Sequence, residues 1–284
     1  MNRKVISCLS SSLFFCLLAL PVRAESILAK IQQTGTLNLA IREDAAPFGY
    51  LDSSGNLQGY CLDFFELLEK QLITTLNRNT LSIKLLKSTA STRFSLVSNG
   101  IVYLECGANS IRPDPPDRIS FSTAFFITGT QLLINQKNRS RLNLDRSLNE
   151  VILGVVDNTT TERYLAKTYP AATIQKFSGV TARSRGVEGV TRGKIDAMVD
   201  DGILLRAEAQ KQGLISSDYH LIPQTPLTCD RYGMIIKSED PQWQDFVNSI
   251  IDSPEAGILY RAWFGSYLAD RNLSKSEDLL DCFE

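Results

Sequence analysis

The chain has 284 residues, and its 30 lysines and arginines nearly balance 31 aspartates and glutamates. A chain this evenly charged lacks the basic excess that nucleic acids and anionic membrane surfaces attract, so we expect neither as a partner. The single histidine argues against histidine-based catalysis and against a transition-metal cluster, and we expect no cofactor and no metal site.

The N-terminus has the pattern of a cleavable export signal. A charged start at residues 1–4 precedes an apolar stretch at 5–20 and a small-residue exit at 21–24. We expect cleavage after residue 24, because the apolar stretch is too short and too rich in serine for a membrane span. No second stretch of spanning length follows, which predicts a periplasmic chain that is not embedded in a membrane. The remaining length, about 260 residues, predicts two lobes.

Strand and helix patterns alternate along the first part of the mature chain. Residues 36–41 alternate apolar and polar side chains as a strand does, and residues 62–72 repeat apolar side chains at helical spacing. A strand over 81–86, a helix near 94–97 and a strand ending at Cys106 follow. This alternation predicts an α/β protein whose lobes are mostly parallel sheets flanked by helices.

The second part of the chain restarts the same pattern. Residues 121–134 are apolar enough to form one buried connecting strand, and a further strand is expected at 151–156. The spacing of Thr159 and Glu162 is a capping box, which predicts that a helix begins there. The remaining expected elements are a helix around 187–190, strands at 195–199 and 232–236, and helices at 243–251 and 258–264.

Polar residues follow the carboxyl ends of several predicted strands, where open α/β sheets bind their ligands. These residues are Arg42, the segments 106–112 and 158–161, and the pair Asp200 and Asp201. A free amino acid needs a bidentate cation for its carboxylate, an anion for its ammonium group and N–H donors at a helix start. The strand ends supply each of these groups, so they are suited to capture a small zwitterion.

Several segments, in this order along the chain, resemble family 3 of the bacterial extracellular solute-binding proteins. The segments are residues 35–50, 55–63, 121–126 and 193–197, and the likeness runs from about residue 27 to residue 264. Residues 105–110 are more similar to the branch of the family that binds glutamate and aspartate.

The resemblance implies a type II periplasmic-binding-protein fold of two lobes joined by two hinge crossings. Residues 25–128 and 231–284 would form the first lobe and residues 129–230 the second. The family consists of amino-acid receptors of ABC importers. The resemblance therefore implies a monomer that binds a polar or acidic amino acid, with glutamate or aspartate favoured, and delivers it to an ABC permease.

The same resemblance assigns a carboxylate clamp in the first lobe. Arg112 is similar to the family arginine that holds the ligand α-carboxylate, with Asn109 and Ser110 beside it. The family arginine usually stands six residues before the Phe of the Phe-Ser motif, where this chain has Pro115. Because of that departure, Arg118 is a competing candidate.

Other roles implied by the resemblance fall in the second lobe. Asp201 matches the aspartate that receives the ligand ammonium group, with Asp200 as the second candidate. Thr159 and Thr160 resemble a loop that holds the carboxylate from this lobe, although Asn158 stands where the family has glycine. Asparagine tolerates a left-handed backbone better than most residues, so the turn can be retained.

Side-chain selectivity is implied by two arginines and a missing aromatic residue. Arg42 stands where relatives that bind basic amino acids carry an acidic residue, which suggests an anionic ligand side chain. Arg183 is a candidate second contact. Ala45 stands where many relatives place a stacking aromatic residue, so Phe48 or Tyr50 would have to supply that wall.

Each of these residues also has an interpretation without a ligand. Arg42 could pair with Glu43 or Asp44 on the surface, because exposed ion pairs are common. Asp201 could cap the helix that follows it. Arg112 could be a solvated loop residue, and the aromatic side chains could belong to the core.

The cysteines after the signal are Cys61, Cys106, Cys229 and Cys282. An even number in an oxidising compartment predicts two disulfides rather than a metal site. The resemblance extends to the ligand domains of ionotropic glutamate receptors, where a similar bridge implies that Cys229 pairs with Cys282. Cys61 is then left for Cys106.

One alternative function belongs to a different class. Some proteins of this fold are periplasmic dehydratases that act on arogenate or prephenate and use a carboxylate as general acid. Glu105 and Asp200 would be the candidates for that role here. We favour a binding protein over an enzyme.

Overall fold

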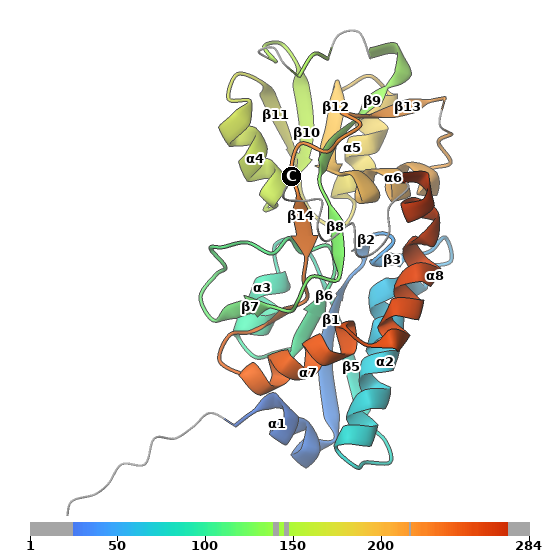
Figure 1. The fold of residues 1–284 in the computed structure, drawn as a ribbon. Coiled ribbons are helices and arrows are strands. Elements are labelled where there is room, and N and C mark those ends of the chain that lie inside the picture. The colour runs from blue at the N-terminus through green and yellow to red at the C-terminus, as the bar shows by residue number, and fades with distance from the viewer. Residues whose placement is uncertain (1–24, 139–141, 145–147, 216, 272–284) are drawn as a thin grey trace, which may run out of the picture.

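The computed structural model describes residues 25–138, 142–144, 148–215 and 217–271 of the chain. Two five-stranded sheets lie one above the other, and two short strands cross between them (Figure 1). The predicted signal, residues 1–24, lies outside the described residues. We call the sheet nearer the N-terminus, with its helices, the first lobe and the other sheet, with its helices, the second lobe.

The sheet of the first lobe has the strand order β5-β1-β6-β15-β7. Its strands are β1 (Thr36–Arg42), β5 (Ser82–Ser88), β6 (Leu104–Cys106), β7 (Ile119–Phe121) and β15 (Ile235–Lys237). Strand β1 pairs in parallel with β5 and β6, whereas β15 is antiparallel to β6 and β7. Every strand except β15 therefore runs in the same direction, and the expected mostly parallel sheet is confirmed.

The sheet of the second lobe repeats this arrangement, with the order β11-β10-β12-β9-β13. Its strands are β9 (Thr130–Asn135), β10 (Ile152–Val156), β11 (Thr173–Phe177), β12 (Ala197–Asp201) and β13 (Tyr219–Ile222). Strand β10 is parallel to β11 and β12, and β9 is antiparallel to β12 and β13. Each sheet has one antiparallel strand, β15 in the first lobe and β9 in the second. In both cases it is the first strand that the chain adds to the sheet after crossing from the other lobe.

The two crossing strands are β8 (Phe126–Thr128) and β14 (Asp230–Tyr232), which pair antiparallel. The expectation of one continuous strand over residues 121–134 is wrong, because this run forms β7, β8 and β9. The chain leaves the first sheet at Ser122, whose hydroxyl accepts a hydrogen bond of 2.9 Å from the Met234 N–H. At Gly129, between β8 and β9, an added Cβ would lie 1.8 Å from the Thr228 carbonyl oxygen, so the crossing segments leave no room for a side chain there.

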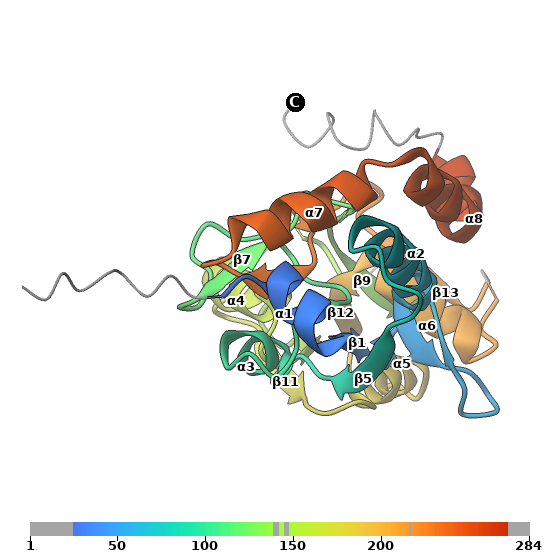
Figure 2. The same ribbon diagram turned by 90° about the horizontal axis from the view of Figure 1, so that it is seen from below.

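Helices cover both faces of the first sheet (Figure 2). One face carries α1 (Ile27–Thr34), α2 (Tyr60–Thr75), α7 (Pro241–Ile251) and α8 (Pro254–Arg271), and the other carries α3 (Arg93–Ser98). The alternation along β1 explains the two layers, since Leu39 and Ile41 pack toward the first group and Ala40 packs toward α3. Among the described residues, no helix combines the length and hydropathy of a membrane span.

The second sheet is covered in the same way. Helices α5 (Ala182–Thr191) and α6 (Gly202–Lys211) pack on the face that contains Leu133 and Met198. Helix α4 (Thr160–Thr168) packs on the face that contains Ile134 and Val199. Three short strands, β2 (Asp44–Ala45), β3 (Gly49–Leu51) and β4 (Leu57–Gln58), form a small sheet after β1, and a short helix η1 (Gln136–Asn138) follows β9.

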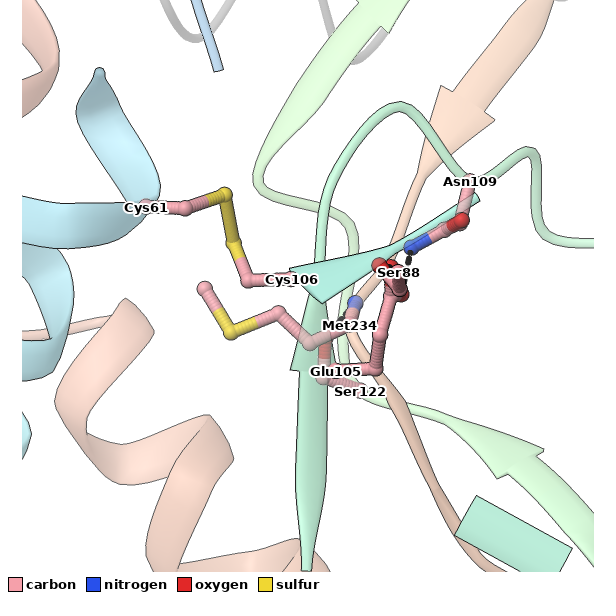
Figure 3. The surroundings of a disulfide bond; sticks show 7 residues. All are labelled: Cys61, Ser88, Glu105, Cys106, Asn109, Ser122 and Met234. Carbon is pink, nitrogen blue, oxygen red and sulfur yellow. Dashed lines mark hydrogen bonds between the residues drawn. A yellow bond between two sulfur atoms is a disulfide. The ribbon is translucent and has the colours of Figure 1, made fainter. Parts of the chain in front are cut away.

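A disulfide joins Cys61 in α2 to Cys106 at the end of β6 (Figure 3). Both cysteines are fully buried, and their Cα atoms are 5.7 Å apart. This bridge confirms the pairing of Cys61 with Cys106. Cys229 is also disulfide-bonded. Its predicted partner, Cys282, lies outside the described residues.

Removing this bridge should destabilise the protein. The cysteines are 45 residues apart, so the bridge restricts a long loop of the unfolded chain. We expect the double variant Cys61→Ala/Cys106→Ala to lose about 4 kcal/mol of unfolding free energy. Urea denaturation of both proteins under non-reducing conditions measures the difference, since the bridge at Cys229 is present in both. An unchanged denaturation midpoint would contradict this prediction.

Candidate ligand-binding cleft

A cavity of about 290 Å³ lies between the two lobes. Its walls are made by residues from both sheets and from the helices that follow them. The first lobe contributes Arg42, Ala90, Ser91, Arg93, Phe94, Ala108, Ser110 and Arg112. The second contributes Asn158, Thr159, Thr160, Thr161, Glu162, Arg163, Arg183, Asp200, Asp201 and Leu204. Most of these residues lie at or just after the carboxyl end of a strand, where ligands of open α/β sheets bind.

Arg42 lies at the end of β1 and is held by Asp44. Its Nε atom is 2.6 Å from Asp44 Oδ1 and its Nη2 atom is 2.9 Å from Oδ2. Both side chains are buried, so the pairing with Asp44 that we considered occurs in the interior and not on the surface. Burial opposes both charges, but the charge of the partner and the hydrogen bonds between the two side chains together outweigh it. The pKa of Arg42 is therefore raised and that of Asp44 is lowered.

Arg183 in α5 forms a second buried ion pair and reaches across the cleft. Its Nε atom donates to Asp200 Oδ2 at 2.8 Å, and its Nη1 atom donates to the backbone carbonyl of Asp44 in the first lobe. Burial acts to lower the pKa of Arg183, but Asp200 and Asp44 outweigh it and raise the pKa. The charges of Arg42 and Arg183 are therefore both balanced from within the protein.

Arg93 is a buried cation that the sequence analysis did not select. It begins α3, and its Nη2 atom donates to the Asn158 carbonyl of the second lobe at 3.3 Å. Its Nε atom has no hydrogen-bond acceptor, and Arg93 forms no ion pair with any described residue. Burial, helped by the positive charge of Arg42, lowers the pKa of Arg93 to about 9.

Arg112 lines the cavity, whereas its competitor Arg118 does not. The Arg112 guanidinium lies 5.2 Å from the centroid of the Phe94 ring, and that of Arg93 lies 4.8 Å from the same centroid. Arg112 also forms no ion pair within the described part of the chain, and its buried Nε atom lacks an acceptor. Arg118 is exposed and pairs with Glu239 at 3.6 Å. The interpretation of Arg112 as a solvated loop residue is not supported, because its side chain is half-buried in the cavity wall.

Asp201 is a buried carboxylate at the end of β12. The Tyr232 hydroxyl, on crossing strand β14, donates to Oδ2, while Oδ1 has no partner in the described structure. Burial, together with the charges of Asp230 and Asp200, raises the pKa of Asp201 well above its usual value. Asp201 precedes α6, but its side chain makes no capping hydrogen bond, so capping does not explain it.

The start of α4 forms the opposite wall of the cavity. The Thr159 hydroxyl accepts from the Glu162 N–H at 3.1 Å, and Glu162 Oε2 accepts from the Asn158 N–H at 2.7 Å, so the helix start predicted from the capping box is confirmed. Asn158 has a left-handed backbone with φ of 62°, which is the conformation that we expected asparagine to tolerate. Thr160 hydrogen-bonds across the cleft to Ser110, with their hydroxyl oxygens 3.1 Å apart.

Asn109 lies beneath the cavity and does not line it. Its Nδ2 atom donates to Glu105 Oε2 at 2.6 Å, and the Ser88 hydroxyl donates to Glu105 Oε1 at 2.6 Å (Figure 3). Burial raises the pKa of Glu105, but this carboxyl is fully enclosed and forms no part of the cavity wall. Asp200 lines the cavity but is paired with Arg183. Neither carboxyl that we considered as a general acid is therefore placed to donate a proton to a ligand.

The aromatic wall of the cavity is Phe94. Phe48 is fully buried among Phe126 and other core rings, so these two residues belong to the core. Tyr50 faces a different hollow, beside Pro47. Within the described residues there is also no group of histidine, cysteine and carboxylate side chains that could hold a metal ion.

The signal that could have found Arg93 and Phe94 is present in the sequence. Both residues follow β5, which ends at Ser88 and is parallel to β1. The strand predicted at 81–86 has its carboxyl end there, and residues beyond the carboxyl ends of strands in open α/β sheets are candidates for ligand binding.

Comparison with known proteins places the chain in a family. The family of bacterial extracellular solute-binding proteins, family 3, matches residues 37–266. The glutamate/aspartate import solute-binding protein of Escherichia coli is 28% identical over an alignment of 269 positions, which covers 91% of this chain and 86% of that protein. The L-glutamate/L-aspartate-binding protein of Pseudomonas aeruginosa is 28% identical over an alignment of 278 positions, which covers 94% of this chain and 90% of that protein.

A solved structure supports the fold. An ancestral amino acid-binding protein, described as a precursor of cyclohexadienyl dehydratase, has a TM-score of 0.72 and 20% identity, and covers 86% of this chain and 99% of that one. The named relatives of the chain are solute-binding proteins and not enzymes. Since the family match spans most of the chain, the protein belongs to family 3 of the bacterial extracellular solute-binding proteins, as its sequence resemblance implied.

Proposed function

We propose that this protein binds a free acidic L-amino acid, glutamate or aspartate, between its lobes in the periplasm and delivers it to the permease of an ABC importer. The observation that carries the proposal is the set of charges that the cavity leaves without a counter-ion. These are the guanidinium groups of Arg93 and Arg112 and the carboxylate of Asp201. The names of the relatives from Escherichia coli and Pseudomonas aeruginosa agree with this ligand class.

The free charges match the ligand one for one. An acidic amino acid carries two carboxylates and one ammonium group. The cavity offers two guanidinium groups without a counter-ion in the described structure and one carboxyl, that of Asp201, which the ligand ammonium group would keep ionised. A neutral amino acid would leave one guanidinium without an anion, and a basic amino acid would bring a second cation to the arginines. Because a buried charge without a partner is costly, both alternatives should bind more weakly.

The placement of the free charges suggests the orientation of the ligand. Arg112, beside Ser110 and opposite Thr160, would hold the α-carboxylate, while Asp201 would receive the ammonium group. Arg93 is more deeply buried than Arg112 and feels the charge of Arg42, so it would hold the side-chain carboxylate. The guanidinium groups of Arg42 and Arg183 would lie behind the side-chain carboxylate of the ligand.

The ligand would also favour the closed arrangement of the lobes. We propose that residues 25–128 with 231–284 form one lobe and residues 129–230 the other, hinged at β8 and β14. The hydrogen bond between the Thr160 and Ser110 hydroxyls and the one from Arg183 to the Asp44 carbonyl join the two lobes. A ligand that contacts both sides adds to these contacts, and an ABC permease would recognise the closed monomer.

A thermal-shift screen of the twenty common amino acids tests this function. We expect glutamate or aspartate to give the largest increase in melting temperature, because only these ligands satisfy every free charge in the cavity. At a hundred times its dissociation constant, a ligand adds about 2.7 kcal/mol of stability. A larger shift with lysine or arginine would contradict the proposed ligand class.

The two free arginines should affect binding in different ways. We expect Arg112→Gln to weaken glutamate and glutamine about equally, because both ligands carry an α-carboxylate. We expect Arg93→Gln to weaken glutamate by roughly 10- to 100-fold and glutamine much less, because a hydrogen bond to a charged group contributes about 1.5–3 kcal/mol. Isothermal titration calorimetry with both ligands measures the four dissociation constants.

The matched control for these two variants is Arg192→Gln. Arg192 is exposed, follows α5, and pairs with Glu188 at 2.5 Å. Its loss should leave binding of both ligands unchanged. Equal losses of glutamate affinity in the Arg192 and Arg93 variants would show that Arg93 acts only through net charge.

Replacing Asp201 with asparagine should abolish ligand binding and stabilise the free protein at neutral pH. The pKa of Asp201 is raised in the folded state, so the folded protein retains this proton where the unfolded chain has lost it. Its contribution to stability is present below the unfolded pKa and is lost as the pH rises through the folded pKa. The stability of Asp201→Asn relative to wild type should therefore increase from pH 4 to pH 8.

Urea denaturation without ligand at several pH values measures this difference. Asp245→Asn removes the same charge from an exposed position on α7 and serves as the control. A constant difference between wild type and Asp201→Asn across this range would contradict the assignment of a raised pKa to Asp201.

A further inference from the structure

Asp44 is a carboxylate of the protein that pairs with Arg42, a residue of the cavity wall, although Asp44 does not itself line the cavity. It begins β2, two residues beyond Arg42, which ends β1 and lines the cavity. Its two oxygens take the Nε and Nη2 donors of Arg42 at 2.6 and 2.9 Å, which is the bidentate geometry that a ligand carboxylate would adopt. The exposed fractions of the two side chains are only 2% and 4%. The cation of Arg42 is therefore occupied before any ligand arrives.

The surroundings keep this pair together. The aliphatic part of Arg42 lies against Gly107, where an added Cβ would be 2.3 Å from Arg42 Cγ, so the arginine has no room to turn away on that side. The Asp44 backbone is held by the Arg183 guanidinium of the second lobe. A ligand carboxylate would have to displace Asp44 to obtain the same two donors from Arg42.

We propose that Asp44 determines side-chain specificity by occupying Arg42, and so limits the preference of the cavity for an acidic side chain over the corresponding amide. This inference rests on the proposed function, because it concerns the side-chain end of a bound amino acid. Without the Asp44 charge, Arg42 and Arg93 would both face a ligand carboxylate as free cations. With it, Arg93 alone supplies the excess positive charge at that end of the cavity.

The test is the ratio of the dissociation constants of glutamine and glutamate, measured by calorimetry for wild type and Asp44→Asn. Asparagine keeps an oxygen near Arg42 and the backbone carbonyl for Arg183, but it removes the charge. We expect the ratio to rise by at least about tenfold, the effect of gaining one charged hydrogen bond, because glutamate binds more tightly while glutamine changes little. A ratio within about twofold of wild type would overturn the inference.

Glu43→Gln is the matched control. Glu43 is the neighbouring residue and pairs with the exposed Lys87 at 2.7 Å, so this variant removes the same charge outside the cavity. Its ratio should equal that of wild type. A rise in this control as large as that in Asp44→Asn would also overturn the inference, since net charge alone would then account for the effect.

A double-mutant cycle separates action through Arg42 from a general structural change. In the Arg42→Gln background, Asp44→Asn should no longer raise the ratio, because the cation that it frees is absent. An equal rise with and without Arg42 would show that Asp44 does not act through it.

The double variant Arg42→Gln/Asp44→Asn keeps the inference testable even if Asp44→Asn alone does not fold, because it removes both charges of the buried pair. The inference requires this double variant to lower the glutamate preference less than Arg93→Gln does, since only Arg93 is free, and the opposite order would contradict it. Failure of wild type to bind either ligand would instead refute the proposed function.

Discussion

The interaction on which the rest of the structure depends is the meeting of unbalanced charges across the cleft. Arginine side chains from both lobes converge on one cavity, and two of them, Arg42 and Arg183, are neutralised by aspartates of the protein. Arg93 and Arg112 are not, and Asp201 in the opposite lobe has no cation within the described structure. Closing the lobes therefore encloses two guanidinium groups of the first lobe and one carboxyl of the second that lack an ion-pair partner among the described residues, and an acidic zwitterion in the cavity would pair with all three.

The topology explains how these charges meet. Each lobe directs the carboxyl ends of its parallel strands toward the other, so short segments after β1, β5, β6, β10 and β12 come together although they are far apart in the chain. The crossing strands take part as well. Tyr232 lies on β14 and donates its hydroxyl to Asp201, so the carboxylate that would bind the ammonium group is attached to the hinge.

Much of this architecture could be predicted from the sequence because it follows from local patterns. The period of residues 36–41 predicted β1, the Thr159 to Glu162 spacing predicted the start of α4, and the rule about strand ends selected Asp201 and Arg112. The same local pattern failed over residues 121–134, where the apolar residues on either side of Ser122 and Gly129 suggested one strand. The breaks at these two residues depend on Met234 and Thr228, which contact this segment only in the folded chain.

The electrostatic state of the site could not be predicted in the same way. The sequence places Asp44 two residues after Arg42, but it does not reveal that the pair is buried. One of the groups that meet at this pair is the Arg183 guanidinium, which is 139 residues from Asp44 and reaches its carbonyl from the other lobe. Arg93 was missed for a related reason, since a single arginine at a helix start gains meaning only when its neighbours leave it without a carboxylate.

A crystal structure of the protein grown with L-glutamate tests the central claim most directly. The account predicts one glutamate molecule in the cavity between the lobes, with its ammonium nitrogen within about 3.2 Å of Asp201 and its carboxylates at hydrogen-bonding distance from Arg112 and Arg93. A glutamate bound elsewhere, or one in the cavity whose ammonium group lies away from Asp201, would contradict it.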